Sequence, residues 1–484
     1  MNTKYIIIAV VIALGFTSCK GFLDEYSQDE VAPKDVREYA QILQGEAYIR
    51  DYSLPYTYID LLTDDVKAVV NLKNRNGNDQ RTNGWGYFSW QNTPEITTIG
   101  SLNPDIAWST LYHHILTANI ILKDLPKMKG SESEKLQLEG EAHAIRLNAY
   151  FYLANLYAPP YDKAKAESTP GVPLNDKAHA EDAQFPRAKL SENYAEMIQD
   201  LEAAENAFQK SGLPGDIFTW NLAAVSILGS RMYLYKQDYE NTIKYANKAL
   251  KINPAIQDLN ALDLSKDIFL TKKNKEITLS YGSYSINYFV PGSKAYFSIS
   301  DELESLYTKN DLRKSGKDGL FFRSKRIRIG GSWLRPVWAY YPAVEKGGPT
   351  GDTMVFGFAI RTAEALLNRA EAYAELGKLS EAMADINRLR ENRMKKGTPA
   401  LEQPATKEEV IKIVREERRR ELAFEQHRWF DLRRWGQPEI KHFYIKNMQS
   451  GEGEEYTLSQ GDPRYTLPIP QAVLESDPSL SNKK

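Results

Sequence analysis

Apolar residues recur with the spacing of a helix face in four long segments, and this pattern predicts a mainly α-helical protein. Residues 108–122 carry a large apolar side chain at every third or fourth position, and residues 133–158 repeat the pattern along a longer stripe. Residues 219–250 and 357–391 each contain two helical runs joined by a short turn, with small residues where the helices would meet. The alanine and glycine spacing of the last segment is that of a tetratricopeptide-type hairpin. These patterns predict a scaffold of paired helices.

Two regions, residues 51–104 and 262–356, lack this helical periodicity. The first is rich in Asn, Gly, Thr and aromatic residues, and the second in Gly and Tyr. Alternating apolar and polar residues predict short strands at 277–281 and 326–329. Long irregular segments in a compact body often carry function, so we expect ligand contacts in these two regions. The proline-punctuated tail after Leu458 is expected to run extended over the helical body.

Residues 415–436, REERRRELAFEQHRWFDLRRWG, combine many charges with several large aromatic side chains. They contain no glycine or proline before Gly436, so the composition predicts one helix that ends there. In such a helix Glu417, Glu421 and Glu425 would form a stripe of like charge, which is unfavourable unless cations pair with it.

The stripe has two interpretations, a solvated face or a face that docks onto arginines from other helices. The hairpin segment 357–391 supplies candidate cations. These are Arg361, Arg369 and Arg388. We therefore expect residues 415–436 to pack against that hairpin, with Trp429 and Trp435 buried and several charges paired across the interface.

The first residues of the chain are typical of a bacterial lipoprotein leader. A basic start is followed by an apolar run at residues 5–16, which is too short to span a bilayer, and by Thr-Ser before Cys19. We expect residues 1–18 to be a signal peptide and Cys19 to be acylated on its thiol and amine, which would anchor the protein to a membrane. Residues 19–35 are polar and acidic and predict a flexible tether, and residues 36–484 are expected to form a single domain.

Composition narrows the function classes. The 62 basic and 64 acidic residues nearly balance, so no global basic field favours nucleic acid as a partner. A single cysteine allows neither an internal disulfide nor a cysteine metal cluster. The sequence also lacks a Walker loop, a dinucleotide-binding glycine motif and a nucleophile elbow. No feature argues for catalysis, and we expect neither an enzyme nor a cofactor or metal site.

Several motifs together resemble one known family. They are Cys19 with GFLDE at 21–25, WSTLYHHILTAN at 108–119, GEAHAIRLNAYFYLANLY at 140–157, FPRAKLSENYAEMIQDLEAAE at 185–205, RTAEALLNRAEAYAELG at 361–377, and the charged segment at 415–436. In this order they resemble the SusD/RagB family of Bacteroidetes outer-membrane lipoproteins, over essentially the whole chain after Cys19. One departure is Ala158-Pro159-Pro160, where the family usually has a glycine.

The resemblance implies a helical fold with tetratricopeptide-like hairpins as scaffold and irregular loops as ligand surface. It also implies binding rather than catalysis. Members of the family sit on a SusC-like TonB-dependent transporter and deliver oligosaccharides to it, and some members deliver peptides. The expected location is the outer membrane, lipid-anchored and facing the cell exterior. The alternatives are a RagB-like peptide-binding subunit of such an importer, and a helical-repeat envelope scaffold without a small ligand.

Sugar rings present apolar C–H faces that stack on aromatic rings, while charged and amide side chains bind the hydroxyls. Aromatic residues of the two irregular regions are therefore the candidate ligand contacts. They are Trp85, Tyr87, Trp90, Tyr284, Tyr288 and Trp333, with Arg81 and Asp65 as polar partners. The competing interpretation of each aromatic residue is packing within the loops, and it applies most strongly to Trp90.

Overall fold

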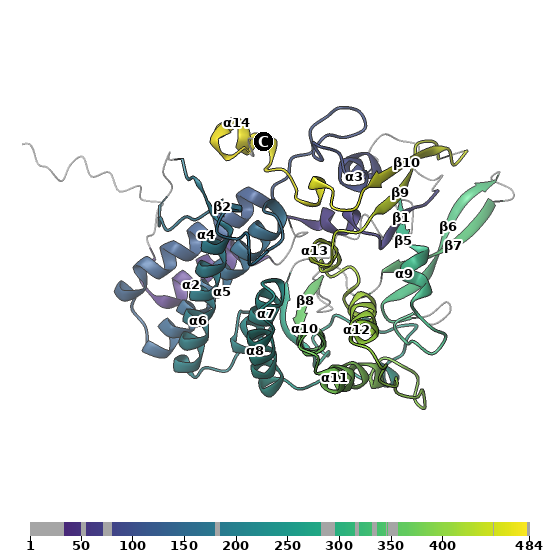
Figure 1. Ribbon diagram of the computed structural model, residues 1–484. Coiled ribbons are helices and arrows are strands. Elements are labelled where there is room, and N and C mark those ends of the chain that lie inside the picture. Colours follow the sequence, from purple (N-terminus) through teal and green to yellow (C-terminus); the bar gives the residue numbers. More distant parts are fainter. Residues whose placement is uncertain are drawn as a thin grey trace, which may run out of the picture.

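In the part of the chain that the structure describes, helices predominate and five pairs of strands lie around them (Figure 1). The computed structural model describes residues 33–49, 55–70, 80–179, 184–281, 296–314, 319–331, 336–344, 346, 357–448 and 450–481. In Figure 1 the long helices occupy the left and lower parts of the molecule, some of the strand pairs lie on the right-hand side, and the others lie among the helices. The mainly α fold expected from the periodicity is confirmed.

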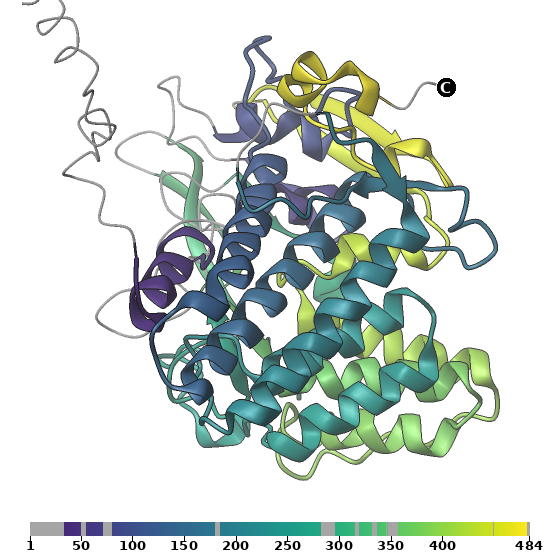
Figure 2. The same ribbon diagram turned by 90° about the vertical axis from the view of Figure 1, so that its left-hand side faces the viewer.

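The helical segments predicted from apolar spacing are confirmed as α4 (Ala107–Asp124), α5 (Glu132–Tyr157), α7 (Leu222–Tyr235), α8 (Tyr239–Ile252), α10 (Thr362–Glu375) and α11 (Leu379–Glu391). The structure adds the long helices α2 (Val36–Glu46), α6 (Leu190–Ser211) and α12 (Lys407–Leu422). Helices that follow one another in the chain pack side by side, as Figure 2 shows for α4, α5 and α6. Local signals also set their ends, because Ser131 and Glu134 form a capping box at the start of α5.

The two helical hairpins, α7–α8 and α10–α11, turn in the same way. In the second hairpin Gly377 has a φ of 74°, and in the first Gln237 stands at the equivalent place with a φ of 61°. A left-handed residue after the first helix is a common way to end it, and glycine adopts this conformation without steric strain. The α8 and α10 helices also contact each other, so the two hairpins form one continuous layer.

All five strand pairs are antiparallel. They are β1 (Val66–Ala68) with β5 (Phe297–Ile299), β2 (Pro170–Pro173) with β3 (Arg187–Lys189), β4 (Ile277–Tyr281) with β8 (Phe358–Arg361), β6 (Phe322–Gly331) with β7 (Pro336–Val344), and β9 (Ile440–Ile445) with β10 (Gly453–Leu458). The strands predicted at 277–281 and 326–329 are confirmed as β4 and part of β6. The remaining helices are short: α3 (Gln80–Phe88), α9 (Asp301–Ser305), α13 (Arg428–Arg434) and α14 (Gln471–Ser476).

The irregular region predicted at 51–104 contains helical structure that its composition did not predict. A 3₁₀ helix covers Thr57–Leu62, and α3 runs through a segment with two glycines. Gly86 is needed there for close packing, because a Cβ at this position would lie 2.2 Å from the carbonyl oxygen of Pro94. Tertiary contacts therefore overcome a weak local helix propensity.

Residues 415–436 form two helices instead of one. The α12 helix ends at Leu422 and α13 begins at Arg428, and in the turn between them Phe424 and Gln426 have φ values of 57° and 66°. Glu425 therefore lies outside the helix and does not extend the predicted stripe. The turn buries Phe424 and points Glu425 at Lys346 and Arg361.

The predicted packing of this segment against the α10–α11 hairpin is confirmed. Arg361 donates to both Glu421 and Glu425, and Arg390 of α11 donates to Glu417 at 3.1 Å. Burial raises the pKa of Glu421, but the charges of Arg393, Arg361 and Arg313 outweigh it and hold that pKa well below its usual range. The glutamate face is therefore ionised inside the protein.

Three details of that prediction are wrong. Arg369 pairs with Asp385 of α11, and Arg388 donates to the Pro254 carbonyl at 2.6 Å, so neither contacts the glutamates. Arg313, Arg393 and Lys346 take their places; the two arginines approach from turns and Lys346 from next to β7. Trp429 is fully buried as predicted, but Trp435 is only half-buried, and its Nε1 donates to Glu371 at 2.9 Å.

Candidate functional site

The aromatic residue Trp85 lies half-exposed on α3, beside the β9–β10 hairpin. Its ring meets the ring of Tyr456 edge-on, with centroids 6.3 Å apart and an interplanar angle of 79°. The Tyr456 hydroxyl donates to Glu454 at 2.9 Å, and Lys446 pairs with the same carboxylate. Trp85, Tyr456, Glu454 and Lys446, together called the Trp85 surface, thus combine apolar ring faces with charged groups in contact with solvent.

The inner side of α3 holds this surface rigidly. The His442 ring of β9 is sandwiched between Phe88 and Trp90, each at a centroid distance of 4.2 Å. The His442 ring nitrogens lie 2.6 and 2.9 Å from the carbonyl oxygens of Phe88 and Thr63. These buried contacts fix α3 against β9, so the exposed side of α3 and the β9–β10 hairpin keep one mutual orientation.

Three of the predicted ligand contacts are buried in this part of the fold. Trp90 is 2 % exposed, and its Nε1 donates to the Leu62 carbonyl at 3.0 Å. Tyr87 is stacked on Tyr58, with centroids 4.0 Å apart. Asp65 is 1 % exposed and accepts a hydrogen bond from Arg419 Nε at 2.6 Å. Their side chains position neighbouring elements and do not line a surface.

The side chains of the other four predicted contacts are not among those that the structure describes. Tyr284, Tyr288 and Trp333 lie outside the described residues, and Arg81 is described only as a backbone position within α3. Among the predicted aromatic contacts that the structure describes, Trp85 alone is partly exposed.

The sequence predictions missed the partners of Trp85 on the β9–β10 hairpin. Glu454 and Tyr456 are two residues apart on β10, so their side chains lie on the same face of the strand. In the pairing with β9, Tyr456 lies opposite His442 and Glu454 opposite Tyr444. This alternation is visible in the sequence at 453–458 as a strand signal. The sequence does not show that β10 lies next to α3, because the two segments are far apart along the chain.

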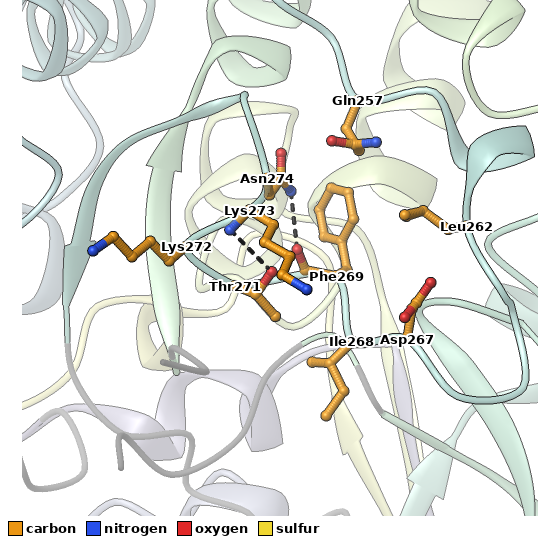
Figure 3. Close-up of a pocket in the computed structure, with 9 residues that line it drawn as sticks. All are labelled: Gln257, Leu262, Asp267, Ile268, Phe269, Thr271, Lys272, Lys273 and Asn274. Atoms are coloured by element: carbon orange, nitrogen blue, oxygen red, sulfur yellow. Dashed lines mark hydrogen bonds between the residues drawn. The ribbon is translucent and has the colours of Figure 1, made fainter. Parts of the chain in front are cut away.

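Apart from the Trp85 surface, the structure has a pocket near the start of the irregular region predicted at 262–356. It has a volume of about 570 Å³ and is lined by Gln257, Leu262, Asp267, Ile268, Phe269, Thr271, Lys272, Lys273 and Asn274 (Figure 3). We call it the Phe269 pocket. Its lining mixes apolar side chains with two lysines and one carboxylate, so it can take a polar ligand with an apolar face.

Within the described residues, no three His, Cys, Asp or Glu side chains come together in a way that could hold a metal ion. Over the same part of the chain, no helix has both the length and the apolar character needed to cross a bilayer.

Comparison with known proteins identifies the family. A family model described as starch-binding and associating with the outer membrane matches residues 22–234, and a SusD family model matches residues 343–483. The chain belongs to the SusD family. Two SusD-like proteins of Formosa agariphila are each 25 % identical to it, over 399 and 387 residues, and each match takes in 70 % of this chain and 73 % of the relative.

Solved structures share the fold over almost the whole length of this SusD-family chain. A SusD superfamily protein from Bacteroides thetaiotaomicron has a TM-score of 0.70 at 19 % identity, covering 93 % of this chain and 100 % of the other. A protein from Bacteroides vulgatus described as a putative sugar binding protein has a TM-score of 0.69 at 23 % identity, covering 93 % and 98 %. A SusD-like carbohydrate binding protein from the same organism has a TM-score of 0.70 at 17 % identity, covering 92 % and 97 %.

Proposed function

We propose that this SusD-family protein captures oligosaccharides at the cell surface and passes them to a SusC-like TonB-dependent transporter. The observation that carries the proposal is the Trp85 surface, where a half-exposed indole and a tyrosine ring meet beside ionised side chains on a rigid backing. Aromatic rings stack on the C–H faces of sugars, and charged groups bind the hydroxyls. The proposed site also includes Arg81, Tyr284, Tyr288 and Trp333.

The family description and the neighbouring structures support a sugar as the ligand. The model that matches residues 22–234 is described as starch-binding, and two of the structurally similar proteins are described as sugar or carbohydrate binding. The buried candidates Tyr87, Trp90 and Asp65 then have a supporting role, because they hold the elements that carry the site.

Isothermal titration with a panel of neutral oligosaccharides tests the proposal. We expect at least one member to bind and the Trp85→Ala variant to lose at least tenfold in affinity for it, because stacking on the indole is removed. Phe443→Ala is the matched control: Phe443 is 50 % exposed on the same hairpin, but its neighbours His442 and Tyr444 are buried, so it lies on the opposite face of β9. Equal losses in both variants, or none in Trp85→Ala, contradict this placement.

A peptide ligand is the outcome that would replace a sugar. If no oligosaccharide binds while a peptide panel does, the RagB-like function holds. If neither class binds, the protein is an envelope scaffold without a small ligand.

The location and the transporter have their own tests. We propose that Cys19 carries the lipid anchor and that the protein faces the exterior of the outer membrane. Labelling with a palmitate analogue in cells should mark the wild type and not Cys19→Ser, and external protease should digest the wild type on intact cells. Pull-down of the anchored protein should retain a TonB-dependent transporter, and its absence from the retained proteins contradicts that partnership.

A further inference from the structure

The Phe269 pocket has an apolar back and a polar rim. Phe269 is buried at the back, and Leu262 and Ile268 are half-buried beside it. Lys273 extends from the turn that follows Phe269, Asp267 extends from the segment that precedes Phe269, and Gln257 lies near the Phe269 ring (Figure 3). An apolar back with several polar groups at the rim is the usual construction of a small-molecule site.

Hydrogen bonds fix the turn that forms one wall of the pocket. Asn274 donates through Nδ2 to the Phe269 carbonyl at 3.0 Å, and its Oδ1 accepts from the Glu276 amide at 2.9 Å. The Lys273 amide donates to Thr271 Oγ1 at 3.3 Å. The lysines therefore project from a backbone that is already ordered.

The opposite wall is held by the buried ion network. The Gln257 amide donates to Glu276 at 2.8 Å, and Arg393 donates to the Gln257 carbonyl at 2.7 Å. Behind the pocket, the guanidinium groups of Arg361 and Arg393 lie 5.3 and 5.5 Å from the centroid of the Phe269 ring. A ligand that enters this pocket meets walls that need little rearrangement, which reduces the entropic cost of binding.

The rim carries excess positive charge. Lys272 and Lys273 are exposed, and no described carboxylate lies within ion-pair distance of either ammonium group. The carboxylate of Asp267 offsets only one of the two charges, and its Oδ2 already accepts the Asp263 amide at 2.8 Å. The Lys272 ammonium lies 5.9 Å from the centroid of the Phe218 ring, a contact that leaves its charge in place. A concave site with excess positive charge at its rim raises the local concentration of anions.

We propose that the Phe269 pocket binds an anionic sugar unit, a ring that carries a carboxylate or a sulfate group. This inference rests on the proposed function in so far as the ligand is a saccharide, but it concerns a site separate from the Trp85 surface. Lys273 binds the anionic group, Gln257 Oε1 and Asp267 accept hydroxyls, and Leu262 and Ile268 contact the apolar face of the ring. Lys272 points away from the pocket in Figure 3 and adds only its charge at the rim. The Asp267 carboxylate disfavours a plain inorganic anion, because it repels an anion that offers no hydroxyl.

The test is titration of the full-length protein with three oligosaccharides of equal length, one built of hexuronates, one sulfated and one neutral. Lys273→Met removes the charge and keeps the length of the side chain. Lys275→Met is the matched control, because Lys275 is an exposed lysine of the same turn that does not line the pocket. We expect Lys273→Met to weaken binding of an anionic oligosaccharide at least tenfold and Lys275→Met less than twofold. The arm that binds, hexuronate or sulfated, identifies the anionic group.

Three results would overturn the inference: neither anionic oligosaccharide binds, Lys275→Met weakens binding as much as Lys273→Met, or an acidic peptide alone binds through Lys273. Melting temperatures of both variants within experimental error of the wild type confirm that folding is unchanged. Trp85→Ala separates the two proposals. Loss of neutral oligosaccharide binding in that variant with retained anionic binding supports two independent sites. If a neutral oligosaccharide binds through Trp85 and no anionic oligosaccharide binds at all, this inference is overturned and the proposed function still holds.

Discussion

Arg393 and Glu421 form a two-pronged ion pair inside the protein, in which Nε donates to one carboxylate oxygen at 3.0 Å and Nη2 to the other at 2.9 Å. Both side chains are completely buried. The pair joins α12 to the end of α11, and Arg393 also donates to Glu276, which precedes β4. One arginine therefore connects the helical hairpin, the charged helix and the wall of the Phe269 pocket.

Glu421→Gln should destabilise the protein strongly. Glu421 accepts from Arg313, Arg361 and Arg393, and a neutral amide would leave these buried cations without full compensation. Removing one partner from a buried pair costs about 3–5 kcal/mol, and we expect a loss of this size in the unfolding free energy at pH 7, measured with urea. The control is Glu416→Gln on the same helix, whose partly exposed carboxylate makes only contacts of 3.9 and 4.0 Å with cations, and we expect about 0.5 kcal/mol or less. Similar values for both variants would contradict the importance of the buried network.

Stability should depend on pH through Asp60. Burial, followed by the charge of Asp65, raises the pKa of Asp60 to about 8, although Lys346 opposes the shift. An aspartate in an unfolded chain has a pKa of about 3.9, so the folded state holds an extra proton between these values, and this group lowers stability as pH rises from about 4 to 8.

Asp60→Asn removes that titration. The unfolding free energy of the variant minus that of the wild type should therefore increase between pH 5 and pH 8 by more than about 1 kcal/mol. Urea denaturation at several pH values measures the difference. A difference that stays constant with pH would show that Asp60 titrates alike in both states.

Trp90 and Trp85 should respond differently to truncation. Trp90 is buried, stacks on His442 and donates to the Leu62 carbonyl, so Trp90→Ala should lower the unfolding free energy by about 3–5 kcal/mol. Trp85→Ala should have a smaller effect on stability because the side chain is partly exposed, and its main effect should be on oligosaccharide binding. Urea denaturation and titration of both variants measure the two effects, and the assignment fails if Trp85→Ala proves the more destabilising.

The equivalent turns of the two hairpins allow a matched pair of substitutions. Gln237 has a positive φ, which strains a residue with a Cβ, whereas Gly377 adopts the same conformation freely. Gln237→Gly should raise the unfolding free energy by up to about 1 kcal/mol, since relief of strain is partly offset by the greater freedom of glycine in the unfolded chain. Gly377→Gln should lower it by about 1 kcal/mol. Thermal or urea denaturation checks both signs, and two changes of the same sign would rule out the explanation by strain.

Several elements of the fold could be predicted from the sequence because their signals are local. The helices α4 and α5 and both hairpins follow from apolar spacing, and β4 follows from alternation at 277–281. The helix α3 could not be predicted in this way. Its segment has weak helix propensity, and contacts with Pro94 and His442 decide its conformation.

The candidate site also has features that the sequence could predict and features that depend on tertiary contacts. Composition pointed to Trp85, Tyr87 and Trp90 together, because all three are aromatic and adjacent. Their exposure depends on what covers each side of α3, and the structure buries two of them against η1 (Thr57–Leu62) and β9. Tyr456 meets Trp85 only because β10 folds back beside α3.

The helical scaffold, the two hairpins and the motifs that resemble the SusD/RagB family follow from the amino-acid order alone, because periodicity, small-residue spacing and motif order are properties of neighbouring residues. Which cations face Glu421 and Glu425 depends on how the chain packs in three dimensions. The sequence offered Arg361, Arg369 and Arg388, yet Arg369 pairs with Asp385, while Arg313 and Arg393 approach from turns and Lys346 from a position next to β7. A buried charge pairs with the cation that the packed backbone brings within reach, and that choice is made by contacts between remote segments.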